Sequence, residues 1–243
     1  MRTLPAMALL PGMLCDAMLW RHQTEALRDI ADVRVVDLTR QSSIVEMAEA
    51  VLAEMPERFA VAGLSMGGYV AFEVLRRAPR RVSAVAFLGT VAHPDAPEET
   101  SRRAALIAMQ ERRRFRGFTE PLLALMLHAS RLADAGLVRE ITAMGERVGK
   151  AAFLRQQWAI QRRADSRPDL PAIACPVLAL CGRQDGLAPL SAHAAIASAI
   201  PGARLEIIET CGHLSPLERP EAVTEALRRF LLAASPFSGP AAK

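Results

Sequence analysis

Tyrosine and lysine are nearly missing from this chain of 243 residues, which has one tyrosine and, as lysines, only Lys150 and Lys243. Its positive charge is therefore almost entirely arginine, and its formal net charge is +4. The arginines alternate with glutamate and aspartate and do not gather with aromatic residues, which argues against a nucleic-acid-binding protein. The arginine run at residues 112–114 is typical of a solvated helix face.

Long apolar runs are also lacking. No run approaches the roughly 20 residues that a membrane-spanning helix needs, so we predict no membrane segment. The apolar stretch at residues 4–10 is short, contains Pro5 and ends without a small-residue cleavage site. A secretion signal is therefore not predicted, and the cytoplasm is the default location.

Cysteine is scarce, and its spacing excludes the common metal and redox motifs. The four cysteines form neither a Cys-x-x-Cys pair nor a cluster with histidine. We expect buried, structural thiols and predict no metal and no organic cofactor.

What the sequence does contain is a regular alternation of short apolar runs with longer helical patterns, which predicts strand-helix-strand units and a mostly parallel sheet. Helical stripes are clear at residues 46–55 and 222–231. The predicted strands are residues 7–10, 34–37, 59–63, 84–88, 177–181 and 205–208.

The alternation stops between about residues 94 and 167, where the pattern is helical throughout and both ends are rich in proline. We predict a helical lid at 94–167, inserted into a single α/β core formed by residues 1–93 and 168–234. Residues 235–243 are small and proline-rich, and we expect a flexible tail there.

The strongest chemical signal is Gly63-Leu64-Ser65-Met66-Gly67-Gly68, which lies between a predicted strand and a predicted helix. A serine on a tight strand-to-helix turn exposes its hydroxyl above the sheet, and glycines relieve crowding around it. This context predicts that Ser65 is a nucleophile rather than part of an ordinary glycine-rich turn.

A serine nucleophile needs a general base. His213 follows the last predicted strand and so lies at the same end of the sheet as Ser65; His93, after an earlier strand, is the competing candidate. A carboxylate must orient that base, and Asp185 follows the strand at 177–181 in the chain order serine, aspartate, histidine. Asp95 is the alternative.

Two backbone N–H groups should stabilise the oxyanion of the reaction. Met66 directly follows the serine at the helix start, and Met13 lies in the turn after the first strand. These are the predicted donors, although a plain Pro-Gly turn at Pro11-Gly12 is an alternative interpretation of the second site.

Together these segments resemble the α/β-hydrolase family, in particular its lid-bearing small esterases. The resemblance covers nearly the whole chain and is most specific at residues 63–68, 182–185, 212–213 and 218–221. It implies Ser65, Asp185 and His213 as catalytic triad, Met13 and Met66 as oxyanion hole, and an apolar substrate site near the lid. We predict Trp20, His93, Met126 and Trp158 as substrate-binding residues.

Two features depart from the family pattern. Pro11-Gly12 stands where the family often has His-Gly, and the antiparallel hairpin that usually opens the sheet is missing. A six-stranded parallel sheet with strand 34–37 at its edge follows, and we predict that this edge is covered or used in a homodimer contact.

The predicted reaction is hydrolysis of carboxylic esters with small to medium apolar acyl groups, a small-molecule substrate, through an acyl-enzyme on Ser65. Serine at this position also suits hydrolysis of a lactone or of a C–C bond beside a carbonyl. A ligand receptor with negligible turnover is the alternative from another functional class.

Overall fold

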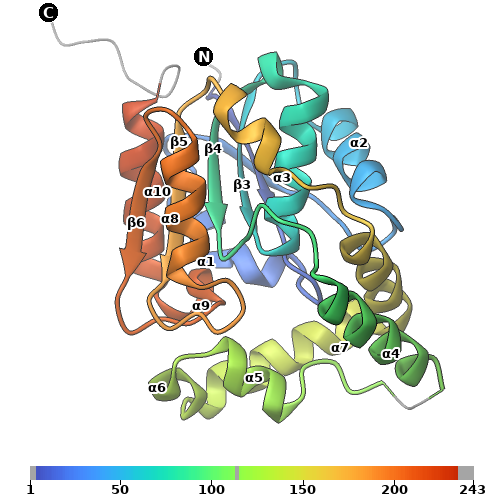
Figure 1. Ribbon diagram of the computed structural model, residues 1–243. Helices are drawn as coiled ribbons and strands as arrows, with labels where there is room; N and C mark the ends of the chain where they lie inside the picture. Colours follow the sequence, from blue (N-terminus) through green and yellow to red (C-terminus); the bar gives the residue numbers. More distant parts are fainter. Residues whose placement is uncertain (1–3, 113–114, 235–243) are drawn as a thin grey trace, which may run out of the picture.

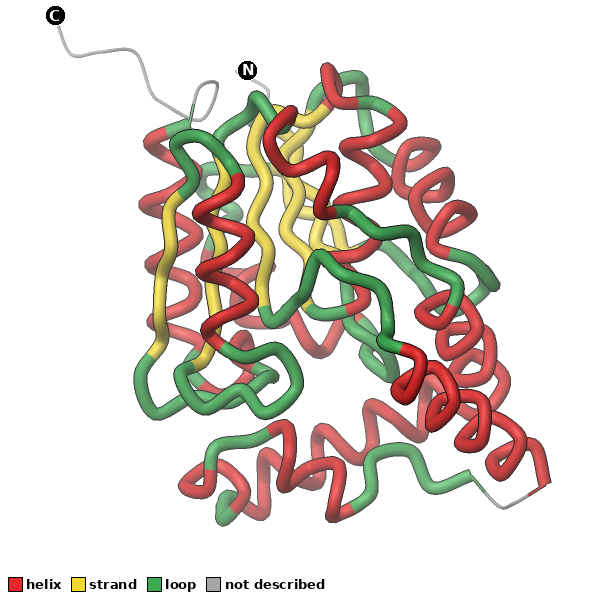
Figure 2. The backbone as a smooth tube through the Cα atoms, viewed as in Figure 1, coloured by secondary structure: helices red, strands yellow, loops and turns green. Residues whose placement is uncertain are grey.

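The computed structural model describes residues 4–112 and 115–234. Arg113 and Arg114 of the arginine run and the predicted tail at 235–243 lie outside the described residues. Within the described part, a six-stranded sheet is flanked by helices on both faces (Figures 1 and 2), which confirms the predicted α/β fold class.

All strand pairs are parallel, and the strand order is β2-β1-β3-β4-β5-β6. The predicted six-stranded parallel sheet is therefore confirmed, with β2 at one edge. β2 begins two residues earlier than predicted, because Asp32 pairs with Ala6 at the start of β1. The strands are β1 (Ala6–Leu10), β2 (Asp32–Val35), β3 (Phe59–Leu64), β4 (Val82–Leu88), β5 (Val177–Gly182) and β6 (Arg204–Ile208).

Alternate residues of the central strands face two separate hydrophobic clusters. In β1, Met7 and Leu9 belong to one cluster, and Ala8 and Leu10 belong to the other. Successive side chains of a strand point to opposite faces, so a strand between two helical layers is apolar on both sides. The inner helices are α1 (Arg21–Ala26) and α10 (Pro220–Ala233) on one face, and α2 (Ile44–Glu54), α3 (Met66–Arg77) and α8 (Leu190–Ala199) on the other.

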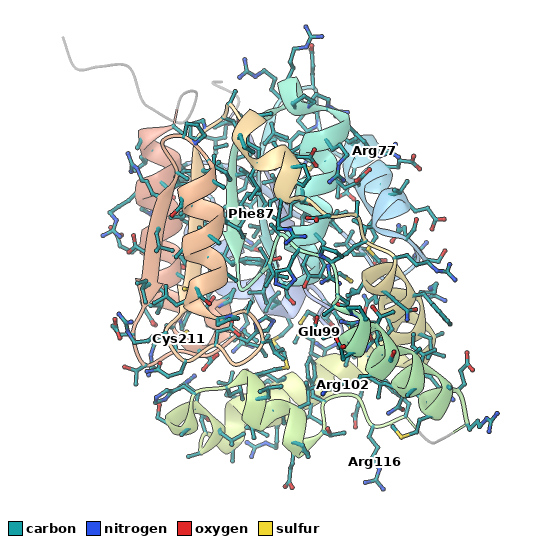
Figure 3. The ribbon with its side chains drawn as sticks, in the orientation of Figure 1. Arg77, Phe87, Glu99, Arg102, Arg116 and Cys211 are labelled. Carbon is teal, nitrogen blue, oxygen red and sulfur yellow. The ribbon has the colours of Figure 1, made fainter. Side chains whose placement is uncertain are left out.

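One aromatic pair illustrates how α3 is fixed to the sheet. Phe87 of β4, labelled in the middle of the sheet in Figure 3, stacks on Phe72 of α3 with ring centroids 4.1 Å apart. Both side chains are buried. Such stacking adds to the burial of apolar area and holds the helix that begins directly after Ser65.

The segment between β4 and β5 is helical, as predicted, and crosses the end of the sheet to which the strands point (Figure 1). Arg116 of this segment is exposed and extends away from the molecule in Figure 3. The division of this segment from the core as a domain at 94 and 167 stays a prediction. Its helices are α4 (Pro97–Arg112), α5 (Glu120–Met126), α6 (Ala129–Leu132) and α7 (Ala135–Gln161), which is interrupted at Gly149 by a φ of 77°.

The remaining helices of the described residues are short: the 3-10 helices η1 (Ala17–Trp20), η2 (Pro79–Arg81) and η3 (Arg167–Ala172), and the single-turn α9 (Ser215–Glu218). The edge strand β2 carries an exposed ion pair between Asp32 and Arg34 at 2.7 Å. Charged side chains on an edge discourage pairing with another strand. The homodimer contact at this edge stays a prediction.

Among the described residues, no helix is long and apolar enough to cross a membrane. The four cysteines are free thiols, and Cys175 alone among them is only partly buried. Burial raises the pKa of Cys175 and of Cys181 to about 11, so both stay protonated at neutral pH. Cys15, Cys181 and Cys211 are buried as predicted, whereas Cys175 is more exposed than predicted.

Candidate active site

Ser65 occupies the turn between β3 and α3. Its backbone has φ 55° and ψ −113°, a conformation that residues other than glycine rarely adopt. The sheet imposes this geometry. The Ser65 N–H donates to the Leu88 carbonyl at 2.9 Å, and the Ser65 carbonyl accepts from the Thr90 hydroxyl and from the Gly68 N–H, each at 2.9 Å. Strained residues of this kind persist where surrounding structure fixes them, and they cluster at functional sites.

The glycines around Ser65 are required by close backbone contacts. A Cβ atom on Gly63 would lie 2.2 Å from the Gly67 carbonyl oxygen, and one on Gly67 would lie 2.2 Å from the Leu10 carbonyl oxygen. On Gly68 it would lie 2.5 Å from the Thr90 hydroxyl. The three glycines of the motif therefore allow the serine turn to pack against β1 and β4.

Asp185 and His213 form a buried pair at the carboxyl ends of β5 and β6. The His213 Nδ1 lies 2.8 Å from Asp185 Oδ2 and 3.0 Å from Oδ1. Asp185 Oδ1 also accepts the N–H groups of Leu187 and Ala188 at 2.8 and 2.9 Å. Burial alone would raise the pKa of Asp185, but the His213 ring and these two amides hold it below its ordinary value. Asp185 is thus a carboxylate that fixes the ring and leaves Nε2 available.

The alternative residues are engaged elsewhere. Asp95 forms ion pairs with Arg103 at 2.6 Å and with Arg163 at 2.7 Å. His93 is exposed, and its Nδ1 lies 2.9 Å from the Pro94 carbonyl oxygen. The geometry therefore pairs His213 with Asp185 and gives Asp95 a structural role at the base of the lid.

Ser65 and His213 line one cavity with about 330 Å³ of atom-free space, part of it open to solvent. Within the described residues, the Ser65 hydroxyl makes no hydrogen bond; nucleophile-to-base bonds are often long without substrate. The lining combines the turn after β1, the serine turn, the lid and the loops after β5 and β6: Gly12, Met13, Cys15, Leu64, Ser65, Phe118, Leu122, Met126, Leu187, His213 and Leu214.

The two residues predicted as oxyanion donors lie close to Ser65. Met13 lines the cavity, and Met66 is the first residue of α3, directly after Ser65. In the described part of the chain, neither the Met13 nor the Met66 N–H group has a protein acceptor. A Cβ on Gly12 would lie 3.5 Å from the Ser65 Cβ, so the turn after β1 closely approaches the serine.

Of the four predicted substrate-binding residues, Met126 lines the cavity and Trp20, His93 and Trp158 do not. Trp20 is fully buried in the hydrophobic core at the end of η1. Trp158 lies on α7 with the Arg162 guanidinium 4.9 Å from its ring centroid. The substrate-binding role of Trp20, His93 and Trp158 stays a prediction.

Glu218 is a buried carboxylate to which the sequence analysis assigned no role. It joins the lid to the loop after β6 that carries His213. Its Oε2 accepts the N–H groups of Gly212 at 3.0 Å and of His128 at 2.8 Å. The His213 N–H in turn donates to the Met126 carbonyl at 2.6 Å. The sequence signal that could have identified Glu218 is its position five residues after His213.

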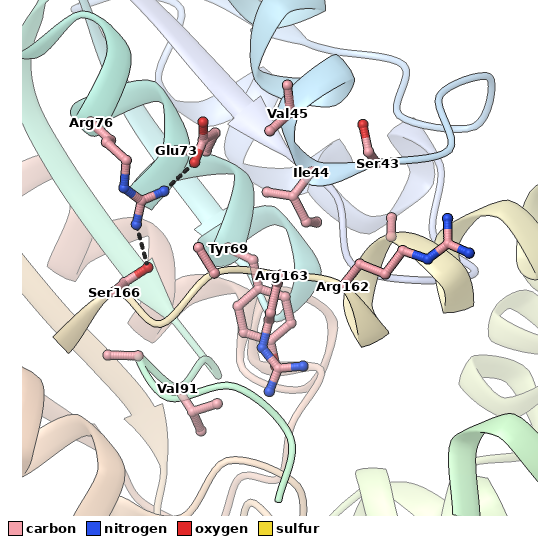
Figure 4. Close-up of a pocket in the computed structure, with 13 residues that line it drawn as sticks. Ser43, Ile44, Val45, Tyr69, Glu73, Arg76, Val91, Arg162, Arg163 and Ser166 are labelled. Atoms are coloured by element: carbon pink, nitrogen blue, oxygen red, sulfur yellow. Dashed lines mark hydrogen bonds and ion pairs between the residues drawn. The ribbon is translucent and has the colours of Figure 1, made fainter. Parts of the chain in front are cut away.

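A second cavity lies between α2, α3 and the end of α7 (Figure 4) and shares no lining residue with the first. Its arginines already have partners. Arg76 binds Glu73 and the Ser166 hydroxyl, as Figure 4 shows, and Arg163 binds Asp95. This cavity therefore has the character of a structural ion-pair network rather than of a second reaction centre.

Groups of three or more histidine, cysteine or acidic side chains arranged to hold a metal ion are not found among the described residues.

Comparisons with known proteins agree with this geometry. A family model described as alpha/beta hydrolase fold matches residues 39–220. The chain is 30% identical to the pimeloyl-[acyl-carrier protein] methyl ester esterase of Xanthomonas oryzae pv. oryzae, with 93% of this chain and 95% of the relative covered. It is 24% identical to the biotin biosynthesis bifunctional protein BioHC of Cellvibrio japonicus over 94% of this chain, and it spans only 48% of that relative.

Among solved structures, a thermophilic esterase from Thermogutta terrifontis matches with a TM-score of 0.87 and 28% identity, covering 95% of this chain and 90% of that one. Because the family model matches most of the sequence and this solved structure covers 95% of the chain, the chain belongs to the alpha/beta hydrolase fold family, as an esterase-like member.

Proposed function

We propose that this chain is a carboxylic ester hydrolase that acts through an acyl-enzyme on Ser65. The observation that carries the proposal is one cavity lined by both Ser65 and His213, with the other ring nitrogen of His213 held by buried Asp185. This combination supplies a nucleophile, a general base and a group that orients the base.

In the proposed reaction His213 accepts the Ser65 proton while the serine oxygen attacks the ester carbonyl carbon. The oxyanion accepts hydrogen bonds from the Met13 and Met66 N–H groups, and one such donor typically contributes about 100- to 1,000-fold in kcat. His213 then protonates the departing alcohol. Water, deprotonated by His213, attacks the acyl-enzyme, and the acid leaves with Ser65 regenerated.

The lining of the cavity supports a small to medium apolar acyl group. Phe118, Leu122 and Met126 of the lid and Leu187 face the same space as Ser65. Most of this wall is apolar, and Met126 can adapt its shape to different chains. The relative named for a methyl ester supports a small alcohol as leaving group.

The test is steady-state hydrolysis of p-nitrophenyl acetate, butyrate and octanoate and of the matching methyl esters. Wild type should turn over many times, and Ser65→Ala should lose at least about 1,000-fold in kcat, consistent with removal of a triad member. Ser83→Ala, at a buried serine in β4, is the matched control and should keep full activity. Full activity in Ser65→Ala would refute the proposal, and a single slow burst from wild type would favour the receptor alternative.

A further inference from the structure

The side chain of Gln156, in the second half of α7, is fully buried and joins the lid to two loops of the core. Its Oε1 accepts the Leu14 N–H at 3.0 Å, and its Nε2 donates to the Leu38 carbonyl at 3.2 Å. An N–H needs an acceptor and a carbonyl needs a donor, so only one orientation of the amide satisfies both partners.

The first of these hydrogen bonds is made by the backbone of the turn that carries Met13, because its donor is the N–H of the next residue, Leu14. Leu14 is fully buried and has a φ of 63°, which a branched side chain adopts only when its surroundings impose it. A bond from the Cys15 N–H to the Gly12 carbonyl at 3.1 Å closes the turn. Without Gln156 the buried Leu14 N–H would lose its acceptor, and the turn could regain one only by rotating its peptide groups.

Two arginines on α7, the half-buried Arg155 and the exposed Arg147, also connect α7 to these loops. Arg155 donates to the Thr39 carbonyl at 2.7 Å, and Arg147 binds Asp16 at 2.8 Å. Salt bridges at the surface contribute little to stability. The buried amide of Gln156 is therefore the contact best placed to fix the turn in one conformation.

We propose that Gln156 is a positioning residue for the oxyanion hole: it holds the turn at residues 12–15 so that the Met13 N–H faces the Ser65 cavity. The inference rests on the proposed function. It makes the lid helix α7, which contributes no residue to the lining of the cavity, a determinant of transition-state stabilisation.

The test compares Gln156→Met, which removes both hydrogen bonds at nearly constant volume, with Gln156→Glu, which keeps an acceptor for the Leu14 N–H. Gln157→Met is the matched control. Gln157 is the next residue of α7, is equally buried, and accepts from Arg103 at 2.6 Å rather than from the turn. Thermal unfolding of each variant separates a folding defect from a defect of the site.

Gln156→Met should lower kcat about 10- to 100-fold, part of the value of one oxyanion donor, with KM changed less than about threefold. Its affinity for a trifluoromethyl ketone, which forms a tetrahedral adduct with the serine, should fall in parallel with kcat/KM. Gln156→Glu should recover most of kcat. Gln157→Met should behave as wild type in both assays.

Hydrogen exchange of the amides at residues 12–15 provides a readout without catalysis. Exchange should accelerate at least about tenfold in Gln156→Met and remain unchanged in Gln157→Met. Wild-type kcat in Gln156→Met, an equal loss in Gln157→Met, or unchanged exchange in the turn would overturn the positioning role. If wild type hydrolyses no ester through Ser65, the proposed function fails, and the exchange result still decides whether Gln156 holds the turn.

Discussion

Replacing Ser65 by glycine should stabilise the fold relative to replacing it by alanine, the reverse of the usual order. A residue with a Cβ held at φ 55° and ψ −113° costs on the order of 1–3 kcal/mol, and alanine retains this cost while glycine does not. Glycine loses more backbone entropy on folding, which costs roughly 0.5–1 kcal/mol. The difference leaves Ser65→Gly more stable than Ser65→Ala by about 1 kcal/mol.

Both variants should be inactive, so stability is the quantity to measure. For a chain of 243 residues, about 1 kcal/mol corresponds to roughly 2–4 °C in Tm. Thermal and urea unfolding of both variants would measure the difference directly.

Ser101 offers a control on the exposed face of α4, where helical backbone favours alanine over glycine by about 1 kcal/mol. The order of the two variants should therefore reverse between positions 65 and 101. If Ser65→Gly unfolds at or below the temperature of Ser65→Ala, the serine turn does not store strain and the reasoning fails.

Three further outcomes follow from the site. Asp185→Asn should lower kcat about 10,000-fold, because an amide in place of the carboxylate favours the wrong tautomer of His213. Steady-state kinetics measures the loss of activity, and circular dichroism checks that the fold is unchanged. A loss below tenfold would contradict this role of Asp185. Burial raises the pKa of Glu218 in the folded protein, so the fold favours the protonated carboxyl. Its contribution to stability is therefore complete below the unfolded pKa of about 4.3 and is lost as the pH rises through the higher folded pKa. The free energy of unfolding of wild type minus that of Glu218→Gln should accordingly fall from pH 4 toward pH 7 in urea titrations, and a rise would refute the assignment. Gly67→Ala should cost about 1–3 kcal/mol or prevent folding because of the contact with β1, whereas Gly136→Ala, whose Cβ meets only a side-chain oxygen at 3.2 Å, should be tolerated.

The sheet could be predicted from sequence because each strand is an apolar run between helical patterns. The edge strand was placed two residues late, since Val35 and Val36 look like its centre while pairing with β1 begins at Asp32. Its register is set by the partner strand, and no local pattern at residues 32–36 reports that partner.

The serine turn and its glycines could be identified because their conformation is a local requirement of the chain. The pairing of His213 with Asp185 could also be predicted, because the carboxyl ends of parallel strands meet at one edge of the sheet. The full burial of Trp20 could not be predicted, because it depends on which side of η1 faces the core. Gln156 received no role because nothing near it in sequence shows that its partners are Leu14 and Leu38.

Two different parts of the structure hold the residues of the site in place. The sheet fixes the nucleophile, since Ser65 bonds to Leu88 and Thr90 at the end of β4. The lid supports the rest: Met126 accepts from the His213 N–H, and Gln156 accepts from the turn beside Met13. A change that shifts the lid should therefore impair proton transfer and oxyanion binding while the serine turn keeps its conformation. Variation in lid sequence could thus alter rate and substrate choice together without disturbing the strained turn on which the nucleophile depends.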